Sequence, residues 1–101
     1  MRVQRRMVFI MTRKQLRMIL DKMTKISNTG CNTLKECSSL NELNLVITDF
    51  NSRFEMISDM CYVLFDSECD RMVIFDKVSQ CKEMLYFAYD ELYYKLLQET
   101  L

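Results

Sequence analysis

Apolar residues in the middle of the chain recur at helical spacing. Between residues 43 and 64, seven apolar side chains follow one another at steps of 4, 3, 4, 3, 4 and 3. Heptad spacing kept this long is typical of a helix with one buried seam. Ser39, with Glu42 three residues later, forms a capping box that predicts where this helix begins. We therefore expect a helix over residues 40–65 with a seam of Leu43, Ile47, Phe50, Phe54, Ile57, Cys61 and Leu64.

A second heptad seam follows an acidic stretch. Its apolar residues again recur at steps of 4 and 3, which predicts a helix over residues 70–98. Acids ahead of it, such as Asp66 and Glu68, suit the positive end of a helix macrodipole. Two long helices with matching seams and a short link are expected to form an antiparallel hairpin. The second seam consists of Ile74, Val78, Cys81, Leu85, Ala88 and Leu92.

A shorter amphipathic helix is predicted before the hairpin, over residues 13–27. Thr12 and Gln15 form its capping box. We expect the helix to end near Asn28 and Gly30, the only glycine, with residues 31–38 as a connector. Residues 1–11 fit a helix, a short strand or a disordered segment, and the helix is favoured because the chain offers no second strand for pairing. The apolar stripe of residues 13–27 is made of Leu16, Ile19, Leu20, Met23 and Ile26.

Composition supports these helices. The chain has 101 residues, of which none is proline and half are hydrophobic. Proline and glycine interrupt helices, so their near absence favours long uninterrupted ones. The predicted fold class is all-α: a small helical bundle in one domain, built on the antiparallel hairpin plus the basic N-terminal helix.

The net charge of zero conceals an uneven distribution. Residues 1–25 contain eight bases and one acid, whereas residues 26–101 contain six bases and thirteen acids. A basic segment of this kind either contacts a polyanion or neutralises the acidic hairpin. No helix-turn-helix, zinc finger or RNP motif accompanies it. The candidate nucleic-acid-binding residues are Arg5, Arg6, Arg13, Lys14 and Arg17.

The chain is poor in the residues that catalysis requires. It has no histidine, which is the commonest general base and metal ligand. One glycine is too few for a glycine-rich phosphate loop. The five cysteines contain no C-x-x-C pair, which argues against a zinc site and favours reduced thiols in a cytoplasmic protein. No segment has the length of a membrane span. We expect no enzyme activity, no metal, no cofactor and no membrane contact.

The last predicted helix is apolar almost all round at its C-terminal end. Eleven of the fourteen residues from 84 to 97 are apolar or aromatic. Either the N-terminal run Val8–Met11 covers this surface, or the surface binds another protein or a second copy of the chain. Tyrosine is enriched in interface cores. The candidate partner-binding residues are Tyr86, Phe87, Tyr89, Tyr93 and Tyr94.

These features predict a non-catalytic protein-binding module: a small regulator, adaptor or inhibitor that acts by occupying a surface. Its size and charge are analogous to those of phage or mobile-element inhibitors of host defence, such as anti-CRISPR proteins. A nucleic-acid-binding protein that uses the basic N-terminal helix is the alternative. A repeated subunit of a larger assembly is a third reading, and it requires the aromatic face to bind heterologously.

Overall fold

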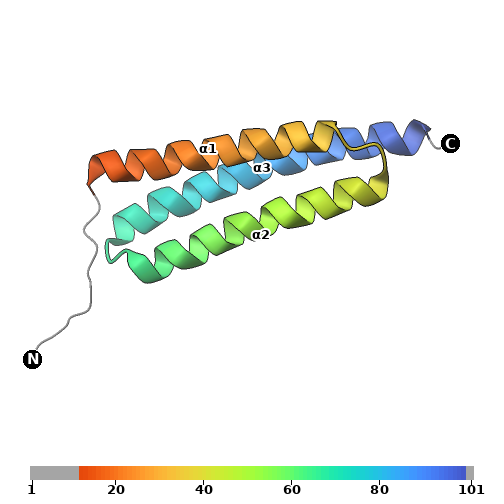
Figure 1. Cartoon of the computed structure of the whole chain (residues 1–101). Helices are drawn as coiled ribbons and strands as arrows, with labels where there is room; N and C mark the ends of the chain where they lie inside the picture. Colours follow the sequence, from red (N-terminus) through yellow and green to blue (C-terminus); the bar gives the residue numbers. More distant parts are fainter. Residues whose placement is uncertain (1–11, 100–101) are drawn as a thin grey trace, which may run out of the picture.

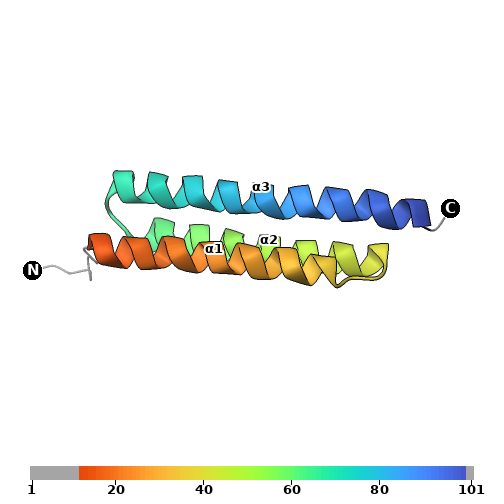
Figure 2. The same ribbon diagram turned by 90° about the horizontal axis from the view of Figure 1, so that it is seen from above.

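The computed structural model describes residues 12–99, which form a bundle of three helices (Figure 1). Helix α1 covers Arg13–Lys35, α2 covers Leu40–Leu64 and α3 covers Glu68–Glu99. Helix α2 runs opposite to α1 and α3, which share one direction (Figures 1 and 2). The described residues contain no strand. The all-α bundle and its antiparallel α2–α3 hairpin are therefore confirmed.

Both predicted N-caps are present, in different forms. The Thr12 hydroxyl accepts a hydrogen bond from the Gln15 backbone N–H at 3.1 Å, and Thr12 N–H donates to Gln15 Oε1 at 3.0 Å. At α2, the Ser39 hydroxyl accepts from the Glu42 N–H at 3.1 Å. The Glu42 carboxylate accepts instead from the backbone N–H of Ser38, at 2.7 Å. Helix α1 thus has a complete capping box. At α2 the Glu42 side chain bonds to Ser38, the residue before the N-cap.

The predicted seams meet in the core. Ile57, Ala88 and Leu92 are partly buried against it, while the side chain of Leu64 lies outside the description. Burial of each fully enclosed aliphatic or aromatic side chain contributes about 1.5–3 kcal/mol to folding. The buried seam residues are Leu43, Ile47, Phe50, Phe54 and Cys61 from α2, and Ile74, Val78, Cys81 and Leu85 from α3.

The predicted end of the first helix near residues 28–30 is wrong, and of the connector predicted over residues 31–38 only residues 36–38 lie outside a helix. Helix α1 continues to Lys35, and Gly30 has no positive φ. Gly30 faces the core, where an added Cβ would lie 2.5 Å from Leu85 Cδ2 and 3.0 Å from Phe50 Cδ1. The glycine therefore does not end the helix; it permits close packing of α1 against both other helices.

Serine and cysteine side chains lie around the point where α1 packs closely on α3. Ser27 is fully buried, and its hydroxyl donates to the Cys81 carbonyl oxygen at 3.3 Å. In return, the Cys81 thiol donates to the Met23 carbonyl oxygen at 3.6 Å. One turn further along, the Cys31 thiol donates to the Met84 carbonyl oxygen at 3.8 Å. Hydrogen bonds from side chains to backbone carbonyl oxygens thus link α1 to α3 over successive turns.

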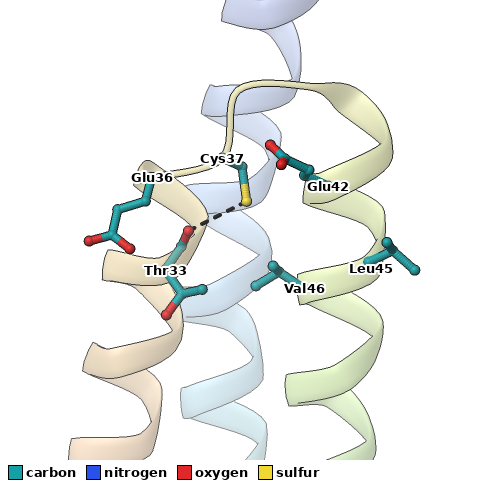
Figure 3. Close-up of a pocket in the computed structure, with 6 residues that line it drawn as sticks. All are labelled: Thr33, Glu36, Cys37, Glu42, Leu45 and Val46. Carbon is teal, nitrogen blue, oxygen red and sulfur yellow. Dashed lines mark hydrogen bonds between the residues drawn. The ribbon is translucent and has the colours of Figure 1, made fainter.

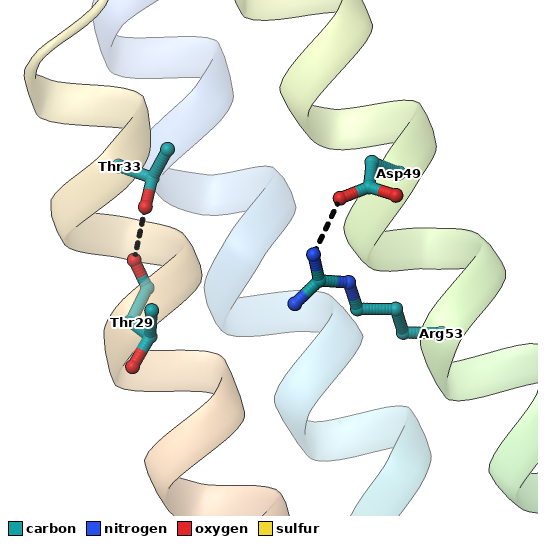
Figure 4. Close-up of polar contacts among 4 residues, drawn as sticks. All are labelled: Thr29, Thr33, Asp49 and Arg53. Carbon is teal, nitrogen blue, oxygen red and sulfur yellow. Dashed lines mark hydrogen bonds and ion pairs between the residues drawn. The ribbon is translucent and has the colours of Figure 1, made fainter.

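Figure 4 shows two local contacts on the outside of the bundle, one within α1 and one within α2. The Thr33 hydroxyl donates to the Thr29 carbonyl oxygen at 2.8 Å, one turn earlier in α1. In α2 the Arg53 guanidinium lies 2.9 Å from the Asp49 carboxylate. Both side chains of that ion pair are more than half exposed, so the pair contributes little to stability. Stability depends mainly on the buried seams.

Helix α3 is the longest element. Its 32 residues span about 48 Å, and its last turns extend beyond the connection between α1 and α2 (Figure 1). None of the described helices combines the length and hydrophobicity that crossing a membrane requires.

Substitution of Gly30 by valine tests the close approach. Even a Cβ added at Gly30 would contact Leu85 and Phe50, and valine adds two further carbons. We therefore expect the free energy of unfolding to fall by about 1–3 kcal/mol. The matched control Asn28→Val places the same side chain on the exposed side of α1 and should change stability by less than about 0.5 kcal/mol. Urea titration followed by circular dichroism measures both. A Gly30→Val protein as stable as the parent would contradict the packing.

Candidate functional site

The aromatic residues of α3 divide between two sides of the helix. Tyr89 and Tyr93 are partly buried against the core. Phe87 is 70% exposed and Tyr94 is 65% exposed, whereas Tyr86 is 42% exposed beside the first pair. The five predicted residues therefore do not form one face. Heptad geometry explains the division, because Tyr89 and Tyr93 flank the buried seam and Phe87 and Tyr94 lie further round the helix.

The inner tyrosines form a ladder along α3. Ring centroids lie 6.3 Å apart for Tyr86 and Tyr89, and 5.8 Å apart for Tyr89 and Tyr93. The Tyr89 hydroxyl donates a hydrogen bond to Asn44 Oδ1 at the start of α2. Burial raises the pKa of Tyr89, and nearby Tyr93 and Asp90 raise it further, so this phenol stays protonated and able to donate. The ladder therefore joins α3 to α2.

The outer aromatic side chains alternate with acids on one stripe, which we call the aromatic–acidic face. Its members are spaced at steps of 4, 3, 4 and 3, so they share one side of α3. All of them are exposed. Large aromatic rings held in water at a regular spacing are a candidate interaction surface. The aromatic–acidic face comprises Glu83, Phe87, Asp90, Tyr94 and Leu97.

The basic residues predicted for nucleic-acid binding lie on a different helix. Arg13, Lys14 and Arg17 occupy the first two turns of α1, and each is exposed. Arg5 and Arg6 lie outside the described residues, as does the Val8–Met11 run that would cover the tyrosines. Three more exposed bases follow along α1, at Lys22, Lys25 and Lys35, against a single acid, Asp21. Helix α1 thus presents a basic outer surface.

A hollow of about 270 Å³ lies where α1 turns into α2 (Figure 3). Thr33, Glu36 and Cys37 line one side of it, and the Cys37 thiol donates to the Thr33 carbonyl oxygen at 3.4 Å. Burial raises the pKa of Cys37, and the carboxylates of Glu42 and Glu36 raise it further. Because the thiolate is the nucleophilic form, this environment makes Cys37 a poor nucleophile.

The carboxylate in the same hollow, that of Glu42, caps the start of α2. Glu42 accepts hydrogen bonds from both the backbone N–H and the hydroxyl of Ser38, and the backbone hydrogen bond is the main cause of its lowered pKa. A carboxylate whose pKa is lowered stays ionised and is poorly suited to proton transfer near neutral pH. Glu42 and Cys37 therefore stabilise the turn, and the geometry assigns them no reaction.

Cysteine accessibility differs across the bundle. Cys61 and Cys81 are buried, and burial raises the pKa of each. Cys69, at the start of α3, is exposed. All five thiols are free, and within the described residues no three histidine, cysteine or carboxylate side chains gather closely enough to hold a metal ion.

Comparison with protein-family models, with curated proteins and with solved structures gives no match for this chain. Function is therefore inferred from the surfaces of the bundle itself. Sequence patterns identified the aromatic residues but missed the apolar side chains that α3 presents beside α1, namely Val73 and Met84, which are 42% and 49% exposed. Val73 and Met84 are eleven residues apart, which places them on one stripe that flanks the buried seam, and this spacing is the signal that could have located them.

Limited alkylation tests the assignment of the thiols. With a small amount of iodoacetamide at neutral pH, we expect Cys69 to react first, while Cys61 and Cys81 stay unmodified because they are buried and protonated. Mass spectrometry of tryptic peptides measures the order. In urea, where burial is lost, the difference should disappear. Modification of Cys81 as fast as Cys69 in the native protein would contradict the described core.

Proposed function

We propose that this chain is a non-catalytic protein-binding module that acts by occupying the surface of another macromolecule. The observation that carries the proposal is the exposure of Phe87 and Tyr94, two turns apart on the outer side of α3. Aromatic rings supply large contact area at low entropic cost and are enriched among residues that dominate binding energy. The acids on the same stripe, Glu83 and Asp90, add charge selectivity for a basic partner.

The position of the face within the bundle supports the same proposal. Helix α3 extends past the end of the α1–α2 connection, so a partner can approach its last turns from several sides (Figure 2). The inner tyrosines hold this half of α3 against α2, which keeps the outer rings on a rigid helix. A preformed helix face binds without a large ordering cost. Five free thiols are consistent with action in a reducing compartment such as the cytoplasm.

Photocrosslinking tests this proposal directly. A benzophenone amino acid in place of Tyr94 should form a covalent adduct with a protein in an extract of the cells that produce this chain. The matched control carries the same group in place of Met56, which is 62% exposed on α2. Phe87→Asp should reduce the adduct at position 94 about tenfold or more, equivalent to 1.4 kcal/mol. Equal adducts at both positions, or none at position 94, would overturn the proposal.

The basic surface of α1 favours a second candidate, a nucleic-acid-binding protein. All six bases within α1 are exposed, against one acid, which is the pattern of a phosphate-contacting helix. The acids of α2 and α3 repel the same polyanion, so this function stands second.

Salt dependence tests the nucleic-acid function. Binding of fluorescent oligonucleotides should weaken linearly on a log–log plot against salt, with a slope of about −0.9 per phosphate contacted on duplex DNA. Arg13→Glu with Arg17→Glu should abolish binding, whereas Arg53→Glu, on α2, should leave it nearly unchanged. Anisotropy titrations measure both variants. Binding that ignores salt, or that survives the paired α1 reversal, would exclude this function.

A further inference from the structure

A hollow lies between the start of α1 and the start of α3. Its volume is about 310 Å³, larger than that of the hollow at the α1–α2 turn. Leu16 is partly buried against the core there, and Val73 is 42% exposed. Apolar side chains in such a position favour a cover that removes them from water. The lining residues are Thr12, Arg13 and Leu16 from α1, and Cys69, Asp70 and Val73 from α3.

An apolar segment directly precedes α1 in the sequence. Residues 7–11 read Met-Val-Phe-Ile-Met, and we call them the N-terminal run. Thr12, the N-cap of α1, follows them in an extended conformation, with φ −78° and ψ 161°. The chain therefore enters α1 through an extended residue, and the helix begins at Arg13. Because Thr12 lines the hollow, the N-terminal run is attached at the hollow itself.

The start of α1 has the residue types of a hydrophobic staple. In this motif, an apolar side chain just before the N-cap packs on the apolar side chain four residues after the N-cap, and the contact fixes how the chain enters the helix. Thr12 is the N-cap and its capping box is complete. Met11 and Leu16 occupy the two staple positions. Since Leu16 lines the hollow, this contact directs the preceding residues over it.

The inner tyrosines of the same chain are out of reach of the N-terminal run. The hydrogen bond between Ser27 and Cys81 sets the register between α1 and α3, which run in the same direction (Figure 1). In that register, Tyr86 lies twenty residues of α3, about 30 Å, beyond the level of Thr12. The segment Val8–Met11 spans at most about 14 Å when fully extended. Within one chain, the N-terminal run can therefore cover only the end of the bundle where α1 begins.

We infer that the N-terminal run folds back over this hollow as an extended strap between the starts of α1 and α3. Side chains alternate along an extended segment, so contact of Met11 with Leu16 also turns Phe9 toward the hollow. Ile10 lies between Met11 and Phe9 in the sequence and faces the solvent. The apolar edge of the hollow and the apolar side of the run then remove each other from water.

This inference goes beyond the proposed function. The rings of the aromatic–acidic face, Phe87 and Tyr94, lie in the second half of α3. A run docked at the start of the bundle leaves both rings uncovered. Photocrosslinking from position 94 therefore tests the proposed function alone, and the experiments below test the strap alone.

Urea unfolding of variants of the full chain tests the strap. Phe9→Asp brings a charge to the hollow and should lower the equilibrium constant for folding about tenfold, equivalent to 1.4 kcal/mol. The matched control Ile10→Asp brings the same charge to the solvent side of the run and should change that constant by less than a factor of about two. Circular dichroism follows both transitions. Equal losses from the two substitutions, or no loss from Phe9→Asp, would overturn the inference.

A double substitution tests whether the run lies on this hollow. Val73→Asp alone should also release the run, so adding it to Phe9→Asp should cause little further loss, because the two side chains share one contact. Met56→Asp, at an exposed position on α2, should instead add its full effect to that of Phe9→Asp. Fully additive losses for Phe9 and Val73 would overturn the inference. So would a coupling that appears only as the protein concentration rises, because the run of another copy would then fill the hollow.

Alkylation of Cys69 gives a second readout at the hollow, which this thiol lines. A docked run shields Cys69 in part, so Phe9→Asp should raise its rate of reaction with iodoacetamide several-fold, whereas Ile10→Asp should leave the rate unchanged. Cys61 is buried in the core and should stay unmodified in both variants, which shows that the bundle remains folded. An unchanged Cys69 rate in the Phe9→Asp protein would overturn the inference.

Discussion

Contact between α1 and α3 is the constraint on which the rest of the structure depends. Gly30 has no side chain at the point where a Cβ would meet Leu85, and Ser27 is fully enclosed one turn earlier. Small residues at these positions let two parallel helices approach closely, and the hydroxyl and thiol bonds to carbonyl oxygens satisfy polar groups that would otherwise be buried without partners. With α1 held there, the exposed bases of α1 and the outer side of α3 are presented side by side.

The heptad seams could be predicted because they depend on local periodicity. Leu43 through Cys61 and Ile74 through Leu85 follow one spacing, and one buried stripe is the simplest way to satisfy it. The end of α1 could not be predicted in the same way. A lone glycine beside asparagine is typical of a helix terminus, and only the position of Leu85, more than fifty residues away, shows that Gly30 is a packing position. Tertiary contact overrode local preference.

The candidate site shows the same limit. The five aromatic residues of α3 could be named from the sequence, but their division into exposed rings, Phe87 and Tyr94, and partly buried ones, Tyr89 and Tyr93, is seen only in the structure. The bond from Tyr89 to Asn44 was beyond sequence reasoning, because it depends on the register between two helices. Composition indicates which residues are available, but relative orientation decides what they face.

The line joining Ser27 to Cys81 also bears on how the chain acquires its fold. Fifty-four residues separate these two positions, so their contact closes a long loop, whereas the α1–α2 and α2–α3 turns bring together neighbours in sequence. During synthesis the apolar stripe of α1 has no α3 to cover it until the ribosome has delivered residues beyond Leu85. Helices α1 and α2 emerge first as an incomplete pair. The last third of the chain then converts that pair into a closed bundle.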